Sequence, residues 1–207
     1  IGAFVASGTI AVATSDADVD TRVEAGATLR AGGDVAVGAH TVNEAHVRAQ
    51  AQAFSGVSLG ATEAFAYSTG STKARLNGNV QSALGGPAAA SVSVTAKSLD
   101  IVEAEARTTN GSLGADASDT GVDSKVDSTI EASIGSGAMV RATGDIRVQA
   151  LSEADAHSTG RGTGFGLGGS FGTARATAEI ATGVDAKVGG SATLSSSGGE
   201  VRVEAFH

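Results

Sequence analysis

Apolar and polar residues alternate with a period of two over long stretches of this chain. Between Ile146 and Ser158, small or apolar side chains occupy every second position, and mostly charged or polar residues fill the positions between. The same alternation runs through 35–51, 122–131 and 173–180. Because successive side chains of a strand point to opposite faces, this period predicts β-strands with one inward and one outward face. The alanine content favours helices, most of all in 39–53 and 98–108, but the persistent period of two outweighs that propensity.

The alternating segments return at a nearly constant interval. Segment 33–39 reappears at 144–150, at 199–205 and more loosely at 90–96, and its second apolar residue occurs at intervals of 57, 54 and 55 as Val37, Val94, Val148 and Val203. Two further series have similar spacing: Leu59, Leu113 and Leu167, and Val23, Leu76, Ile130 and Ile180. The chain therefore reads as a single repeat array over 1–207, with units at 1–32 (partial), 33–88, 89–143, 144–198 and 199–207 (partial).

Small residues decide which β-architecture fits. Of 207 residues, 30 are glycine and 40 are alanine, and aromatic residues make up only 3%. Such side chains fill a thin interior between two closely spaced layers of strands, and stacked units continue one another's hydrogen-bond ladders. We therefore predict an all-β fold: a β-solenoid, or flattened parallel β-helix, of about four stacked units of about 54 residues with a thin core of Ala, Val and Ser. An antiparallel β-sandwich fits less well, because two-residue Asn-Gly or Asp-Gly turns are largely missing.

One repeat segment carries a resemblance. The pattern Gly-Ala-x-Val-x-Ala-x-Gly-Asp-Ile-x-Val-x-Ala at 137–150 resembles the repeats of large bacterial filamentous haemagglutinin-like or adhesin-like exoproteins, surface proteins built on β-solenoids. The resemblance covers all four units. It implies export to the extracellular space or the cell surface, a parent chain much longer than 207 residues, and a structural or adhesive role. It carries over no catalytic residue.

Charge and composition exclude several classes of protein. The net charge of −8 and the pI of about 4.9 disfavour nucleic acid and anionic lipid as partners. The absence of cysteine excludes disulfides and thiolate chemistry. No apolar run approaches the roughly 20 residues that a transmembrane helix needs, so we predict no transmembrane segment.

Three groups of residues are candidate sites. Residues 164–169 match the glycine pattern of dinucleotide-binding loops, but an alternating strand follows them where that site needs a helix. The four histidines, which we interpret as solvent-facing structural residues, show no metal-ligand spacing in the sequence. Two sets of acids, each on one face of a strand, are weak calcium candidates, since side chains two apart on a strand lie nearly 7 Å from each other: Asp16, Asp18, Asp20, Asp119, Asp123 and Asp127.

We therefore expect a non-enzymatic protein without a cofactor, a structural or adhesive segment that forms a rod or filament of stacked coils. Its expected partners are other copies or further repeats of the same protein, joined through open β-edges, and surface glycans or another cell form the second class of partner. Two alternatives remain: a glycan-binding or glycan-cleaving β-helix, and a calcium-stabilised adhesion module. The few aromatic residues, most of them expected in turns, disfavour a sugar-binding groove.

Three structural expectations follow from the spacing. The series Val37–Val203 and the series Leu59–Leu167 should each form one inward column. Lys73 should lie between Asp20 and Asp127, and Glu103 between His46 and His157, so that outward columns alternate in charge. The terminal coils should present unpaired edges against which further coils or another copy pack.

Overall fold

The computed structural model describes residues 4–84 and 86–207, and every helix or strand in that part of the chain is a β-strand. Long strands of about 20 residues alternate with short ones. The prediction of an all-β chain is confirmed, including the two segments most compatible with a helix. The strands are β1 (Phe4–Val23), β2 (Thr28–Ala31), β3 (Val35–Ser55), β4 (Val57–Leu76), β5 (Asn79–Ser82), β6 (Val92–Ser112), β7 (Ala115–Ile134), β8 (Met139–Ala142), β9 (Ile146–Gly166), β10 (Gly169–Ile180), β11 (Gly183–Val188), β12 (Thr193–Ser196) and β13 (Val201–Phe206).

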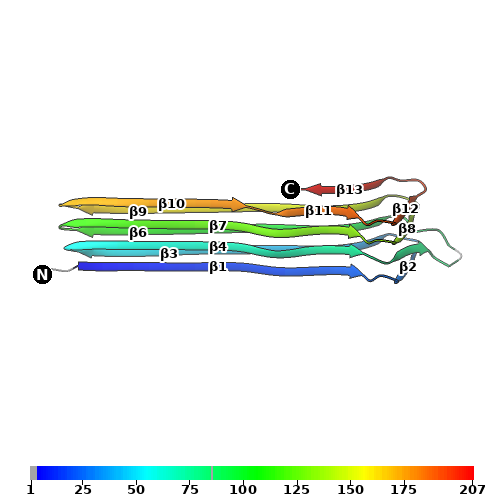
Figure 1. The fold of residues 1–207 in the computed structure, drawn as a ribbon, viewed down its shortest axis with the longest axis horizontal. Coiled ribbons are helices and arrows are strands. Elements are labelled where there is room, and N and C mark those ends of the chain that lie inside the picture. The colour runs from blue at the N-terminus through cyan, green and yellow to red at the C-terminus, as the bar shows by residue number, and fades with distance from the viewer. Residues whose placement is uncertain (1–3, 85) are drawn as a thin grey trace.

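The strands form three parallel sheets that stack as a flattened solenoid (Figure 1). The first broad sheet has the order β1-β4-β7-β10, with β11 also paired to β7, and the second broad sheet has the order β13-β9-β6-β3. The narrow sheet, β12-β8-β5-β2, lies at one end of the long strands. One coil thus consists of a long strand, a tight turn, a second long strand and a short strand. A strand of 20 residues extends about 66 Å at about 3.3 Å per residue, so each coil is long and thin.

The valine series is in register between coils, as the repeat spacing predicted. Val37 pairs with Val94, Val94 with Val148, and Val148 with Val203. The first three side chains are buried, whereas Val203 on the last strand is 45% exposed. The second broad sheet therefore follows the sequence repeat directly.

The leucine series does not form a column, and this prediction was wrong. Leu59 lies on the outward face of β4 and pairs with Ala6 and Ala117, whereas Leu113 and Leu167 lie in the turns before β7 and β10 and are exposed. The main cause is the nine-residue connection between β5 and β6, which is six residues longer than the corresponding connection at 143–145. As a result β4 and β7 pair at an offset of 58 residues, whereas β7 and β10 pair at 54, the spacing of the leucines.

The same shift displaces the third series. Val23 pairs with Leu76 as predicted, but Leu76 pairs with Ile134 rather than Ile130, and Ile180 pairs with Val126. Lys73 therefore lies between Asp20 and Glu131, not between Asp20 and Asp127. Alternation of charge along this column is preserved with a different acid.

The interior changes in character along each coil. Where the three sheets meet, large aliphatic side chains such as Leu76, Ile134 and Val94 form a buried cluster that we call the corner core. Alanines and the valines Val102, Val122 and Val126 form a second cluster, the middle core, farther along the long strands. Beyond it lies a distal segment whose buried side chains are mostly polar: Ser58, Thr62, Thr108, Asn110, Ser112, Asp116, Ser118 and Thr120.

One connection breaks the regularity of the coils. Residues 83–91, between β5 and β6, form a nine-residue loop, whereas the corresponding connections at 32–34, 143–145 and 197–200 have three or four residues. Insertions in repeat proteins collect on one face as loops, and here the insertion lies beside the narrow sheet.

Candidate functional site

The six acidic candidates all lie on the outward face of the first broad sheet. Asp16, Asp18 and Asp20 follow one another on β1, and the other three lie on β7, two strands away. Several of them already have partners: the Asp18 carboxylate accepts a hydrogen bond from Ser71 at 2.6 Å, and Asp20 lies 3.5 Å from Arg75. These acids form a charged outer surface.

The structure does not gather these acids around one position. Within residues 4–84 and 86–207, no three His, Asp or Glu side chains are arranged so that they could share a metal ion. Asp16 and Asp127 lie in the same row of the sheet, but Thr69 separates them. The calcium hypothesis therefore gains no support from the arrangement of Asp16, Asp18, Asp20, Asp119, Asp123 and Asp127.

On the outward face of the second broad sheet, His46, Glu103 and His157 form the column that the sequence predicted. Glu103 pairs with His46 on one side and with His157 on the other, and its carboxylate lies 3.3 Å from the imidazole Nδ1 of His46. The ring of His157 instead lies 3.0 Å from the Thr159 hydroxyl. The column is a cross-strand contact between coils, as its alternating charge predicted.

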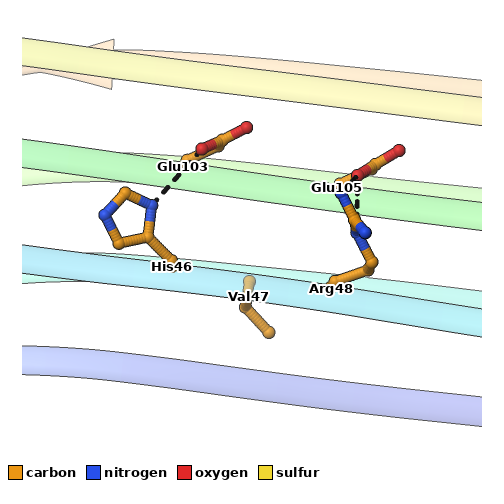
Figure 2. A pocket seen from close by; sticks show the side chains of 5 residues that line it. All are labelled: His46, Val47, Arg48, Glu103 and Glu105. Atoms are coloured by element: carbon orange, nitrogen blue, oxygen red, sulfur yellow. Dashed lines mark hydrogen bonds and ion pairs between the residues drawn. The ribbon is translucent and has the colours of Figure 1, made fainter.

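Next to this column, Glu105 is held by two arginines, and Figure 2 shows the contact with one of them, Arg48. Arg48 on β3 lies 2.6 Å from one carboxylate oxygen, and Arg107 lies 2.5 Å from the other. Burial alone would raise the pKa of Glu105, but the hydrogen bonds and charges of Arg107 and Arg48 outweigh it and lower that pKa below its ordinary value. A shallow hollow of about 290 Å³ lies over these side chains, and its acids are already engaged with His46 and Arg48. The arrangement joins neighbouring coils and offers no free general acid or base.

The aromatic residues are not in turns, and that expectation was wrong. All six phenylalanines and Tyr67 lie in strands. On the first broad sheet, Phe65 and Tyr67 are neighbours with nearly parallel rings, 6.3 Å apart. A groove of about 460 Å³ crosses the same face between Leu59 and Phe171, over small residues such as Ala117. This face therefore combines an apolar groove with nearby aromatic rings.

A second aromatic contact lies on the other broad sheet. Phe54 and Phe165 belong to coils on either side of Gly111, and their ring centroids are 6.3 Å apart. A Cβ atom at position 111 would lie 2.5 Å from the Phe165 ring and 2.8 Å from the Phe54 ring. Glycine at this position lets the two rings meet across the middle coil.

The glycine pattern at 164–169 spans the turn from β9 to β10. The residues that follow it form strand β10, so the helix N-terminus that a dinucleotide site needs for the pyrophosphate is not formed there. The interpretation of these glycines as residues of a close turn agrees with the structure.

The sequence reading missed a buried polar centre, the Asp100 node. Asp100 is fully buried between the corner core and the middle core. One carboxylate oxygen accepts hydrogen bonds from Asn43 at 2.8 Å and from Ser68 at 2.7 Å, and the other accepts from Ser98 at 2.8 Å and from Ser128 at 3.0 Å. These donors lie on β3, β4, β6 and β7, so one carboxylate joins both broad sheets and two adjacent coils.

The signal for this node was present in the sequence. Asp100 and Asn43 both fall on inward positions of the alternation, 57 residues apart, which is the interval between Val37 and Val94. A buried carboxylate needs hydrogen-bond donors, and serine occupies inward positions nearby. Reading the inward positions of neighbouring units together would have placed these residues in one layer.

No protein-family model matches the chain, and no curated protein or solved structure matches it either. In the part of the chain that the structure describes, no helix has the length and apolar character needed to cross a bilayer.

Proposed function

We propose that this chain is a structural or adhesive segment of a long extracellular or cell-surface repeat protein, in which stacked β-coils form a rod or filament. The observation that supports this most is the pairing between coils. β3 pairs with β6, and β6 with β9, in parallel over 21 consecutive residues without a bulge. Such ladders repeat the same contact from coil to coil, which is how solenoids extend.

The outer strands offer the surface for this extension. Among residues 4–84 and 86–207, no strand pairs with the outer side of β1 or β3, or with that of β10. An exposed, flat strand edge pairs readily with another strand. Inward side chains on these strands, such as Ala11 on β1 and Ala174 on β10, are small and would pack against a further coil.

Electron microscopy and sedimentation test this proposal. The purified protein is examined over a range of concentrations, and the expected result is rods or fibrils that lengthen in the stacking direction as the concentration rises. A protein that stays monomeric and compact at high concentration would contradict assembly through the coil edges.

Edge variants make the test specific. Ala11→Lys places a charge on the inward face of the outermost strand, where a further coil would have to bury it, and should suppress assembly strongly. Thr14→Lys is the matched control, because it adds the same charge to the outward face of the same strand. Equal assembly by the two variants would argue against this edge as the contact.

A second candidate function is favoured by the first broad sheet. Its outward groove is lined by Phe171, Leu59 and small residues, and Phe65 and Tyr67 lie farther along the same face. Apolar and aromatic surfaces of this kind contact sugar rings. Glycan binding without cleavage agrees with this face. Substitution of Phe171 by alanine should weaken retention on a neutral glycan array while leaving assembly unchanged.

A further inference from the structure

A hollow on the outward face of the narrow sheet has a different chemistry from the rest of the surface. It has a volume of about 350 Å³, and its walls include Arg30, Gln81, Leu84, Met139 and Arg141. These residues belong to three successive coils and to the start of the long 83–91 loop. We call it the narrow-face hollow.

The two arginines of this hollow are free of acidic partners. In the described chain, ion pairs engage most of the other basic side chains, including Arg48, Arg75 and Lys125. No carboxylate of residues 4–84 and 86–207 lies within ion-pair distance of Arg30 or Arg141. In a chain with a net charge of −8, two uncompensated guanidinium groups in one hollow form a local positive site.

The strand order sets the spacing of these charges. Arg30 pairs with Gln81 across β2 and β5, and Arg141 follows in the same outward column on β8, next to the pair Val80–Val140. The two arginine backbones are therefore separated by two strand spacings, or about 9.6 Å. Between them the Gln81 amide can both donate and accept hydrogen bonds.

The remaining walls are apolar. Leu84 is 87% exposed, and the Met139 side chain is also exposed beside Arg141. A ligand that fits therefore brings anionic groups such as carboxylates for the arginines, hydroxyls for the amide, and an apolar surface for Leu84 and Met139. Guanidinium groups bind carboxylates through two parallel hydrogen bonds, which gives direction as well as charge.

We propose that the narrow-face hollow binds the carboxylates of an acidic polysaccharide, a chain of uronic acid units that runs across the stacked coils. Alternate sugars of an extended polyuronate direct carboxylates to one side at a repeat close to two strand spacings, and sugar rings carry both hydroxyls and apolar C–H faces. An extended acidic peptide fits less well, because its side chains on one face repeat at about 6.8 Å. This inference goes beyond the structural role and does not depend on it, since the hollow opens on the outward face of the narrow sheet, whereas further coils would pair with the edges of the strands.

The test uses short fluorescent oligogalacturonates as probes, in low salt and at protein concentrations below assembly. Wild-type protein should bind the free acid and lose binding to the fully methyl-esterified probe. Arg30→Gln with Arg141→Gln should weaken binding about tenfold. The matched control is Arg161→Gln with Arg175→Gln, which removes two other exposed arginines outside the hollow and should leave binding unchanged.

Each other outcome overturns the proposal. No binding of the free acid by wild-type protein excludes the site, and an equal loss in the control variant assigns binding to overall charge. Polyglutamate bound as tightly, with the same dependence on Arg30 and Arg141, would assign the hollow to acidic proteins instead. Circular dichroism and thermal unfolding confirm that the variants fold, and electron microscopy of the same variants tests rod formation separately.

Discussion

The interior of each coil is filled by different kinds of side chain at its two ends. At the corner, three sheets surround Leu76, Ile134 and Val140, all of which are buried. At the distal end only two broad sheets face each other, and the interior holds side chains such as Thr62, Thr108 and Asn110. The corner is therefore a compact apolar core, whereas the distal end is a thin polar layer.

The difference shows what a third sheet contributes. It turns a narrow gap into a space that large aliphatic side chains fill, and their burial contributes most of the hydrophobic stabilisation. The distal end relies on hydrogen bonds such as Thr108 to Thr62 at 2.8 Å, and it leaves Asn110 Oδ1 and Asp116 Oδ2 buried without a partner among the described residues. We expect the corner to dominate stability and the distal end to open first.

Truncation in the corner core should have the largest effect. Leu76→Ala removes a fully buried side chain where three sheets meet and should lower the free energy of unfolding by about 2–5 kcal/mol. Thr62→Ala at the distal end should cost only about 1 kcal/mol, the usual worth of one hydrogen bond. Chemical denaturation measures both, and equal losses would show that the two ends do not differ as described.

Removal of the Asp100 carboxylate should have the next-largest effect on stability. Asp100→Ala leaves the buried Asn43 amide without its acceptor and should cost about 3 kcal/mol. Asp100→Asn, which keeps an acceptor oxygen, should cost clearly less. Thermal unfolding compares the two variants, and similar losses for both would show that the hydrogen bonds of the node matter little.

Substitution of Gly164 tests how closely the two broad sheets pack at the distal end. A Cβ atom there would displace the Asp116 carboxylate, whose Oδ1 accepts a hydrogen bond from Ser58, so Gly164→Ala should lower the free energy of unfolding by about 1 kcal/mol. Adding Asp116→Ser, which shortens the opposing side chain, should recover part of the loss. Gly183→Ala is the control, because a Cβ atom there meets nothing within 4 Å. A loss in the control as large as that at Gly164 would contradict a local collision.

The smallest expected effect is on the pH dependence of the free energy of unfolding. Burial alone would raise the pKa of Glu131, but Arg75 and Lys187 outweigh it and hold that pKa below its ordinary value. Ionised Glu131 thus stabilises the folded protein at pH values above about 4.3, and this contribution is lost as the pH falls through the lower pKa of the folded state. Glu131→Gln should remove about 0.5–1 kcal/mol at pH 7 and flatten the acid limb of the stability profile below about pH 4.3. An unchanged acid limb of the denaturation curve would exclude this role.

The sequence predicted the second broad sheet better than the first. The interval between Val37, Val94 and Val148 translates directly into pairing because each of these valines is the third residue of a 21-residue strand, β3, β6 or β9, and so moves with the start of that strand. The register of the first sheet depends on the length of the connection after each short strand, which is nine residues at 83–91 and three at 143–145. A period of two contains no information about the length of a connection.

The candidate sites were predicted less well, for a physical reason. An acidic series on one strand, such as Asp16, Asp18 and Asp20, is conspicuous in a sequence, but the structure spreads it along an outer surface. Asp100, Arg30 and Arg141 are isolated in the sequence and gain their surroundings only when coils stack. To predict contacts between stacked coils, the pairing offset of each sheet must be known, and those offsets differ from one sheet to another.

The direction of the strands has a consequence for how a bulk sample would scatter X-rays. Every long strand lies across the stacking direction, and each coil of about 54 residues advances the stack by only about 4.8 Å. An aligned specimen would therefore give a strong reflection near 4.8 Å along its axis, the spacing that is also the signature of amyloid. Here the repeat would come from covalently linked coils of one folded chain, and it would disappear on cooperative unfolding.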